Sequence, residues 1–413
     1  MHSKPPEPGA TTHSWRDVIL ASGVLFIGLA LAQMATGLLV LLLARSVRPA
    51  TYGLVTAALG AATVSLDIAD MGLSSWLVIQ LQNAPRDVSA TVQGVLHLKT
   101  IMSAVVALAL LGGFALLLGP VKYLTVAALA LWVLPAARQQ TQLAALRAQH
   151  RSAAAGGCQA VSRWCALLIF LCSTIIDPSA SATAFCVAIA VGETIGVIST
   201  SRILARSAQR KGSGGGLGWR ILLESRHLAF AGFFSDLQLA DTAIVAAGGG
   251  ALAAGMYALP ARLTGPLGLL STAVSQRVLP MSASGRMSRK SLMLLAVVLA
   301  VLSALIALPL LAWSRPIIRL IGGSQYEMAV EPLRLFAIAM VPASVNQLLA
   351  AWLQGTGSRR YVSMVVGAFT CVELPSIWWS SRLFGAVGAC WVFLALQTIV
   401  VSVFVSRVLR TAE

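Results

Sequence analysis

The stretch that decides the fold runs from Glu224 to Pro280 and reads ESRHLAFAGFFSDLQLADTAIVAAGGGALAAGMYALPARLTGPLGLLSTAVSQRVLP. It consists of two long apolar segments, and only a short turn around Gly248, Gly249 and Gly250 separates them. Ionisable side chains of both signs lie within these segments, among them Arg226, Asp236, Asp241 and Arg262. An ionisable group near the centre of a bilayer costs roughly 2.5–3.5 kcal/mol, so it is usually kept for a pathway or a binding site. The stretch therefore predicts two membrane-spanning helices with either a functional site or an ion pair that locks the helices together.

The composition of the whole chain is that of a membrane protein. Of the 413 residues, 57% are hydrophobic and 11% are charged, with a mean hydropathy of +0.82, whereas soluble domains carry about 25% charged residues. The net charge of +16 does not indicate nucleic-acid binding, because the basic residues lie between apolar spans and form no stripe or tail. The cysteines lie in apolar spans without metal-ligand spacing, so we expect no metal, no cofactor and no disulfide framework.

Apolar segments of about 20 residues, the length that crosses a bilayer, recur along the chain. We predict twelve spans, at 18–43, 52–80, 92–118, 123–146, 157–176, 182–204, 221–247, 251–279, 292–313, 328–353, 362–379 and 387–408. The second and eighth are longer than the others, which predicts a tilt or a break in each. We therefore expect an all-α polytopic membrane protein.

The basic residues predict the orientation of these spans. They gather on the even-numbered connections and the tails, in an excess of roughly three to one, which places both termini in the cytoplasm. The longest stretch without apolar periodicity is the glycine- and serine-rich segment 207–218, which we expect to be a flexible cytoplasmic linker. It divides the chain into two predicted six-helix bundles, 1–206 and 219–413.

The two halves contain a faint repeat. The second span begins Ala50–Val55 (ATYGLV) and the eighth begins Ala254–Leu259 (AGMYAL), at the same place in each half. Transporters built from two such halves bind substrate between them near the midplane of the membrane. The alternative, that tilted spans simply favour a tyrosine and glycine at the start, stays open.

An ordered set of residues resembles the Wzx-type polysaccharide flippases. In the first half these are Ser22-Gly23, Gln33, Leu41–Arg45, Pro49, Tyr52-Gly53 and Asp70–Ser74, and in the second half Asp241, Gly255, Tyr257, Ala261-Arg262 and Pro280. Those flippases belong to one superfamily with the MATE drug exporters and the lipid II flippase.

The resemblance covers nearly the whole chain. It implies two bundles around a central cavity that moves an undecaprenyl-diphosphate-linked oligosaccharide across the bacterial inner membrane. It also implies membrane lipids, and a polymerase and glycosyltransferases of the same pathway, as partners. The outer connections of this chain are short for the family, which leaves the size of the substrate open.

A lipid diphosphate requires cations inside an otherwise apolar protein. The candidate substrate-binding residues are Lys99, Arg163, Arg226 and Arg262, because a guanidinium binds phosphate through two hydrogen bonds. For Arg163 the alternative is that its side chain extends to the cytoplasmic interface. For Lys99 the favoured alternative is a structural ion pair with Asp67 or Asp70, which lie three residues apart on one helix face.

The buried acids have two possible roles. Asp241, Asp236, Asp67, Asp70 and Glu193 either pair with the basic residues or bind a coupling proton or sodium ion. Glu373 precedes Pro375, so it can instead satisfy backbone groups that the proline frees.

Three other classes of function compete with a flippase. A lipid-linked glycosyltransferase or a polysaccharide polymerase needs a sizeable outer loop with catalytic groups. The outer connections here are short apart from 314–327, and no nucleophile–base pair is present, so we expect no catalytic residue. A multidrug exporter of the same fold would favour an acidic cavity, and a structural scaffold would carry fewer charges within the membrane.

Overall fold

Helices are the only regular elements in the part of the chain that the computed structural model describes, which is residues 15–83, 88–149, 151–207, 237–265, 268–283 and 287–410. The first half contains α1 (Trp15–Ser46), α2 (Pro49–Asp70), α3 (Leu73–Asn83), α4 (Val88–Leu117), α5 (Pro120–Ala148), α6 (Ser152–Ile176), η2 (Pro178–Ala180) and α7 (Ser181–Ser207). The second half contains η3 (Leu237–Ala240), α9 (Asp241–Thr264), α10 (Gly268–Ala283), α11 (Arg289–Ala312), α12 (Ser314–Gly322), η5 (Ser324–Ala329), α13 (Val330–Gly355) and α14 (Arg359–Arg410). The expected all-α polytopic fold is confirmed.

Two of these elements, α9 and α14, each consist of two helical arms joined by a tight turn. In α14 the guanidinium of Arg407 lies 5.0 Å from the centre of the Tyr361 ring, although a straight helix would separate the two residues by about 70 Å. The chain reverses at Gly385, whose φ is 60°. In α9 the reversal is at Gly250, with φ 82°, as the short glycine turn predicts. A glycine is needed at both turns because a positive φ is unfavourable for residues with a side chain.

Of the two long predicted spans, the second is interrupted in the structure. It divides into α2 and α3 at Met71 and Gly72, which have φ of 43° and 72°, so the predicted tilt or break is a break in the second span. The eighth comprises the second arm of α9 and α10, which begins at Gly268, and residues 266 and 267 between these two helices lie outside the described part of the chain.

Eight helices in the described residues are long and apolar enough to cross a membrane. One of them is α14, which supplies the eleventh and twelfth predicted spans. Two further predicted spans are α1, of which Ala30–Ser46 is apolar, and α5, whose sequence is interrupted by polar residues. The seventh span, 221–247, lies mostly outside the described residues, as does the predicted linker apart from Ser207.

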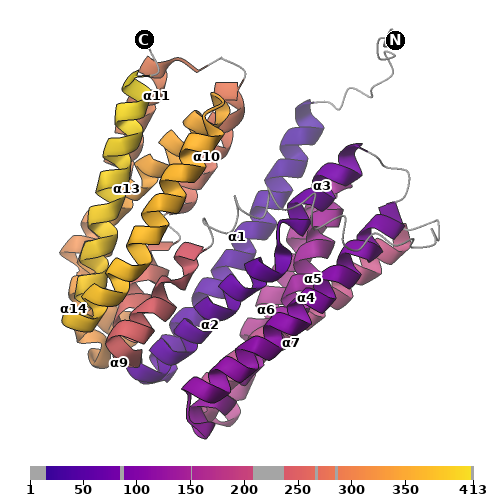
Figure 1. The fold of residues 1–413 in the computed structure, drawn as a ribbon. Helices are drawn as coiled ribbons and strands as arrows, with labels where there is room; N and C mark the ends of the chain where they lie inside the picture. Colours follow the sequence, from indigo (N-terminus) through magenta and orange to yellow (C-terminus); the bar gives the residue numbers. More distant parts are fainter. Residues whose placement is uncertain are drawn as a thin grey trace.

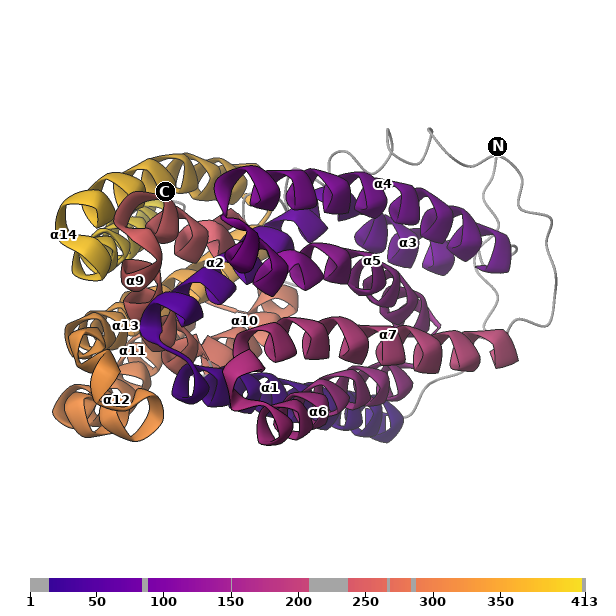
Figure 2. The same cartoon turned by 90° about the horizontal axis from the view of Figure 1, so that it is seen from below.

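The helices form two groups that meet at one end of the molecule. Figure 1 shows α1–α7 on one side and α9–α14 on the other, close together at the lower end and apart at the upper end. We name these the closed end and the open end. Figure 2, seen from the closed end, shows α2 of the first group against α9 of the second.

The contact at the closed end depends on two glycines. A Cβ atom on Gly53 of α2 would lie 1.9 Å from the carbonyl oxygen of Ala251, and one on Gly255 of α9 would lie 2.1 Å from that of Pro49. Small residues of this kind let the backbones of membrane helices approach closely. Beside this crossing, the Tyr52 ring packs edge-on against Tyr326 with 5.9 Å between ring centres. The residues of the faint repeat therefore form the contact between the halves.

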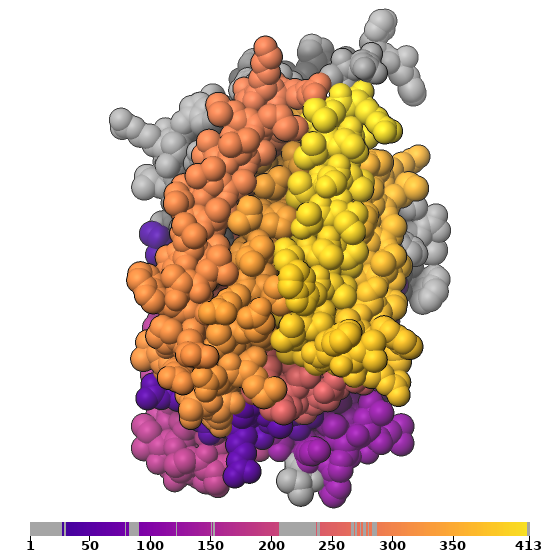
Figure 3. All heavy atoms as spheres, turned by 90° about the vertical axis from the view of Figure 1, so that its left-hand side faces the viewer, coloured from indigo at the N-terminus to yellow at the C-terminus, as the bar shows by residue number. Residues whose placement is uncertain are grey.

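The outer surface of the bundle is apolar, as a surface in contact with lipid must be. Figure 3 shows one face of the molecule, which orange and yellow segments of the second half cover. On α11 the side chains of Leu294, Val297 and Leu305 are between 56% and 67% exposed. Large exposed apolar residues at this density are typical of a membrane-embedded protein.

Candidate functional site

Each helix group encloses a cavity on the side that faces the other group. The N-cavity, of about 520 Å³, lies among α1, α2, α5, α6 and α7. Its polar and charged lining residues are Gln33, Thr36, Thr63, Asp67, Gln139, Gln140, Arg147, Gln159, Arg163 and Glu193, with Arg262 from the second group. The N-cavity therefore combines three arginines with two acids and four amide side chains.

The C-cavity, of about 620 Å³, lies among α9, α10, α13 and α14. Its polar and charged lining residues are Asp241, Thr242, Arg262, Thr264, Ser271, Ser344, Asn346, Gln347, Gln354, Glu373 and Gln397. Apolar rings complete the wall, among them Phe336, Phe369 and Phe393. This cavity has the opposite charge balance, because its two acids face a single arginine.

Arg262 is the one residue that lines both cavities among those described. It lies on the second arm of α9, twelve residues after the turn at Gly250, which is about 18 Å by helical rise. That distance places it near the middle of a hydrocarbon core about 30 Å thick. The side chain is exposed, and no carboxylate among the described residues lies within ion-pair distance of it. As far as the described residues go, its guanidinium donors are therefore available to a ligand.

Asp241 does not form an ion pair with Arg262. Its carboxylate accepts a hydrogen bond of 2.8 Å from the hydroxyl of Tyr257, across the α9 hairpin. A second carboxylate oxygen accepts one of 3.1 Å from the hydroxyl of Thr242. Asp241 thus holds the two arms of the hairpin together while it lines the C-cavity. The structure therefore shows hydrogen bonds at Asp241 in place of an ion pair with Arg262.

Arg163 of α6 turns towards the protein rather than towards the membrane interface. Its guanidinium lies 2.7 Å from the carboxylate of Glu193 on α7. The hydroxyl of Ser162 donates a second hydrogen bond to Glu193, at 3.0 Å. The pair forms part of the N-cavity wall, and its opposite charges largely cancel. The net positive charge of the N-cavity therefore comes from Arg147 and Arg262.

Lys99 is enclosed within the first group and lines neither cavity. Its ammonium group pairs with Asp70 and also donates to Gln140 at 2.8 Å and to Ser74 at 3.0 Å. Asp70 in turn accepts from the backbone and the hydroxyl of Ser74, in the first turn of α3. Lys99 therefore fixes the break between α2 and α3 against α4 and α5. This is the structural alternative, and Lys99 is no longer a candidate for binding substrate.

The remaining predicted site residues fall into two groups. Asp67 and Asp70, three residues apart, take separate positions, because Asp67 lines the N-cavity whereas Asp70 holds Lys99. Glu373 lines the C-cavity, two residues before the proline of its helix. Arg226 and Asp236 lie outside the described residues. Among the residues described, no cluster of histidine, cysteine or acidic side chains has the size of a metal site.

Sequence reasoning missed Arg147 and the amide side chains. Arg147 is among the basic residues of the even-numbered connections, which were used only to predict orientation, yet it lines the N-cavity near the open end of α5. Gln139, Leu143 and Arg147 recur every four residues on that helix, and this spacing puts them on one face. Amides at helical spacing within an apolar span are the signal that could have identified the cavity wall.

Comparison with known proteins agrees with this architecture. The family model MatE matches residues 237–379. No curated protein sequence matches the chain.

Several solved structures share the fold. The inward-closed lipid II flippase MurJ is similar with a TM-score of 0.70 and 12% identity, over 94% of this chain and 87% of that one. An inward-facing multidrug resistance MATE transporter of the MOP superfamily gives 0.69 and 13%, over 94% and 100%. A MOP-superfamily transporter from Pyrococcus furiosus, for which reversed polarity of the binding pocket is described, gives 0.65 and 12%, over 96% of each chain. The chain therefore has the fold of the MATE and MOP transporters.

Proposed function

We propose that this protein is a flippase, which moves an undecaprenyl-diphosphate-linked oligosaccharide across the bacterial inner membrane by alternating access. The observation that carries the proposal is the position of Arg262, a cation without an ion-pair partner among the described residues, where the two cavities meet. An arginine placed in this way needs an anion, because its charge lies near the bilayer centre. A diphosphate supplies two adjacent anions that a guanidinium binds with paired hydrogen bonds.

The lining of the cavities fits the other parts of such a substrate. Arg147 adds a second cation on the N-cavity side, towards the open end. Amide side chains both donate and accept hydrogen bonds, as sugar hydroxyl groups require. Eight such side chains line the two cavities: Gln33, Gln139, Gln140, Gln159, Asn346, Gln347, Gln354 and Gln397. The polyprenyl chain would remain between the helix groups, in contact with the lipid.

The two ends of the molecule support alternating access. The distribution of basic residues predicts that the open end faces the cytoplasm. In that state the substrate would enter from the cytoplasmic leaflet, where glycosyltransferases of the pathway assemble it. Parting of α2 from α9 at the closed end would then release it on the other side, where a polymerase would use it.

Carboxylates near Arg262 are the candidates for ion coupling. Asp241 and Glu373 line the C-cavity, and Asp67 and Glu193 line the N-cavity. A proton or sodium ion taken up by Asp241 would change the field at Arg262, because the two residues share one cavity wall. Neutralising Asp241 removes a negative charge that repels the diphosphate, so binding of the ion and binding of the diphosphate would favour each other.

The experiment that tests this proposal is deletion of the gene in its own host, followed by separation of lipid-linked sugars. We expect lipid-linked repeat units to accumulate on the cytoplasmic leaflet while the surface polymer disappears. Normal polymer in the deletion strain, with no second flippase in the genome, would overturn the proposal.

The second candidate is a multidrug exporter. The observation in its favour is the acidic C-cavity, in which Asp241 and Glu373 lie beside aromatic rings that suit an organic cation. Growth of the same deletion strain on cationic dyes separates the two candidates. Increased sensitivity with an unchanged surface polymer would support the exporter.

A further inference from the structure

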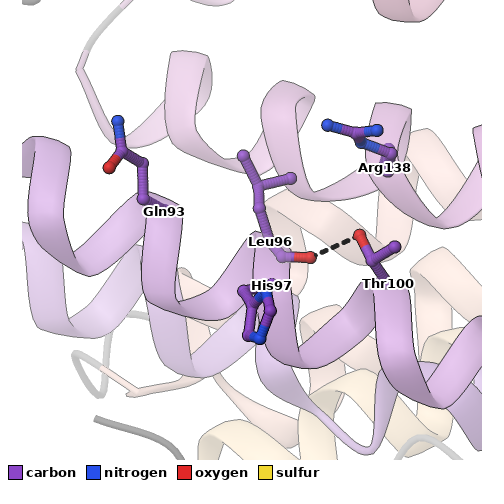
Figure 4. A pocket seen from close by; sticks show the side chains of 5 residues that line it. All are labelled: Gln93, Leu96, His97, Thr100 and Arg138. Atoms are coloured by element: carbon purple, nitrogen blue, oxygen red, sulfur yellow. Dashed lines mark hydrogen bonds between the residues drawn. The ribbon is translucent and has the colours of Figure 1, made fainter. Parts of the chain in front are cut away.

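A third pocket, of about 300 Å³, lies apart from the two central cavities. Gln93, Leu96, His97 and Thr100 of α4 line it together with Arg138 of α5, and Figure 4 shows these side chains on the two neighbouring helices. We name it the α4–α5 groove. The residues of α5 that line the N-cavity, such as Ala136 and Leu143, lie on another side of that helix. At 100° per residue, Arg138 lies roughly 140° around α5 from the middle of the cavity face, so the groove opens away from the transport path.

Arg138 is an exposed cation on a membrane-spanning helix. No carboxylate among the described residues lies within ion-pair distance of it. It precedes the end of α5 at Ala148 by ten residues, which is about 15 Å, and His97 follows the start of α4 at Val88 by about 14 Å. A bilayer is about 40–45 Å thick with its headgroups, and its hydrocarbon core is about 30 Å. The groove therefore lies roughly 9 Å inside the hydrocarbon boundary at the open end, and a long arginine side chain can extend from that depth towards the headgroup phosphates.

Two apolar tracks continue from the groove towards the membrane centre. On α4, Ile101, Val105 and Leu108 are 49%, 61% and 68% exposed. On α5, Leu131 and Leu124 precede Arg138 at intervals of seven residues and are 51% and 68% exposed. Residues at these spacings share a helix face. Each helix thus presents polar residues near the open end, followed by exposed apolar residues. This order matches a phospholipid, whose polar headgroup is followed by apolar acyl chains.

We propose that the α4–α5 groove binds the headgroup of an anionic phospholipid from the leaflet at the open end. The guanidinium of Arg138 donates to the phosphate, and Gln93 and His97 contact the polar part of the headgroup. The hydroxyl of Thr100 donates to the carbonyl oxygen of Leu96 at 2.6 Å, so its oxygen is left to accept from a glycerol headgroup. The acyl chains lie along the two apolar tracks. Basic pockets between helices on the cytoplasmic side are known to hold anionic headgroups.

This site is independent of the proposed transport function, since none of its residues lines the central cavities. The predicted orientation of the chain affects only one part of this proposal, namely whether the lipid comes from the cytoplasmic or the opposite leaflet. Binding can therefore be measured on the purified full chain without a transport assay.

The test is native mass spectrometry of the full chain in neutral detergent, with phosphatidylglycerol and phosphatidylcholine of the same acyl chains added in parallel. We expect phosphatidylglycerol to be retained in preference, and Arg138→Gln to weaken it about tenfold, because a hydrogen bond to a charged group is lost. Binding of phosphatidylcholine should fall less, because the ammonium group of its own headgroup already neutralises the phosphate. Arg138→Lys should keep most of the preference. The matched control is Arg202→Gln, which removes an exposed arginine of α7 outside the groove and should leave both lipids unaffected.

Three results would overturn the proposal. Equal loss of phosphatidylglycerol in Arg138→Gln and Arg202→Gln would mean a general attraction to positive charge. Displacement of the lipid by inorganic phosphate would mean a site for the free anion. Tighter binding of undecaprenyl diphosphate than of phosphatidylglycerol, lost with Arg138→Gln, would assign the groove to a substrate lipid. A thermal unfolding curve of Arg138→Gln that matches the wild type would exclude misfolding, and Leu131→Gln should weaken both phospholipids.

Discussion

Arg262 and Lys99 are both cations within membrane-spanning helices, but their surroundings give them different roles. The Lys99 side chain is fully buried, and its ammonium group has three protein partners on α2, α3 and α5. Arg262 is exposed to two cavities and has no ion-pair partner among the residues described. A cation whose donors are occupied stabilises the protein, whereas one whose donors are free can bind a ligand. Substitution should therefore affect folding at one position and transport at the other.

At Arg262 we expect alanine to abolish polymer export while the membrane abundance of the protein stays normal. Lysine keeps the charge but loses the planar pair of donors, so Arg262→Lys should retain only partial export. The measurement is surface polymer beside protein abundance in the membrane fraction. Arg202→Ala on α7 is the control for loss of an exposed arginine.

A second substitution separates ligand binding from ion pairing at this position. Asp241 has its own hydrogen bonds with Tyr257 and Thr242, so Arg262→Ala with Asp241→Asn should not recover export. Recovery of abundance and export in the double variant would instead assign Arg262 a structural role. Full export in Arg262→Ala alone would remove it from the binding site.

At Lys99 we expect methionine to destabilise the fold, because the carboxylate of Asp70 loses its counterion inside the bundle. Breaking a buried ion pair typically costs about 3–5 kcal/mol. The measurement is thermal unfolding of the purified protein in detergent. Lys99→Met with Asp70→Asn should recover part of the loss, since the uncompensated charge is then gone. Equal stability of Lys99→Met and the wild type would contradict this role.

Among the elements, α2 and α9 decide which end of the molecule is closed. Their crossing at Gly53 and Gly255 leaves no room for even one additional carbon atom. Close approach of the backbones is the main source of attraction between membrane helices, because lipid is as apolar as their side chains. The closed end is therefore held by backbone contact, with Tyr52 and Tyr326 packed beside it.

Gly53→Ala should weaken this closure, because its Cβ atom would lie 1.9 Å from the carbonyl oxygen of Ala251. We expect the two groups to part at this end in a larger fraction of molecules. In a cysteine-free background, a cysteine in place of Thr36 in the N-cavity should then react faster with an impermeant maleimide added outside intact cells. Gly112→Ala on α4 is the matched control, because its Cβ atom would meet nothing within 4 Å. The same labelling rate in Gly53→Ala and Gly112→Ala would contradict a role of the Gly53 contact in closing this end.

At the scale of the whole molecule, two helix groups with cavities of opposite charge balance face each other. The N-cavity holds three arginines and two acids, and the C-cavity two acids and one arginine, with Arg262 counted in both. The N-cavity has a net positive lining and the C-cavity a net negative one. If the two groups move relative to each other, the electrostatic potential at the proposed anion near Arg262 changes. The direction of transport then depends on which end faces the cytoplasm.

We predict that both termini and the linker 207–218 are cytoplasmic, because basic residues gather on that side. A cysteine in place of Ser213, in a cysteine-free background, should be labelled by an impermeant maleimide only after the cells are opened. A cysteine in place of Ser179, between α6 and α7, is the control and should be labelled from outside. Labelling at position 213 in sealed cells would reverse the orientation and the assigned leaflets.

The sequence by itself determined the helical class, most of the spans that the structure describes, the break at Gly72 and the turn at Gly250. These features depend on local properties, namely hydropathy over about 20 residues and the freedom of Gly72 and Gly250 to adopt a positive φ. The ordered residues that resembled a flippase family also pointed to the fold that the solved structures share.

Only the tertiary structure decided which polar residues share a cavity. It separated Asp67 from Asp70, buried Lys99, placed Arg262 where the two cavities meet, and brought Arg147 and the amides to the N-cavity wall. In a soluble protein the apolar face of a helix identifies its inner side, but in a membrane the lipid-facing side is equally apolar. The hydropathy of a helix therefore does not predict its rotation about its own axis. Packing against neighbouring helices decides that rotation.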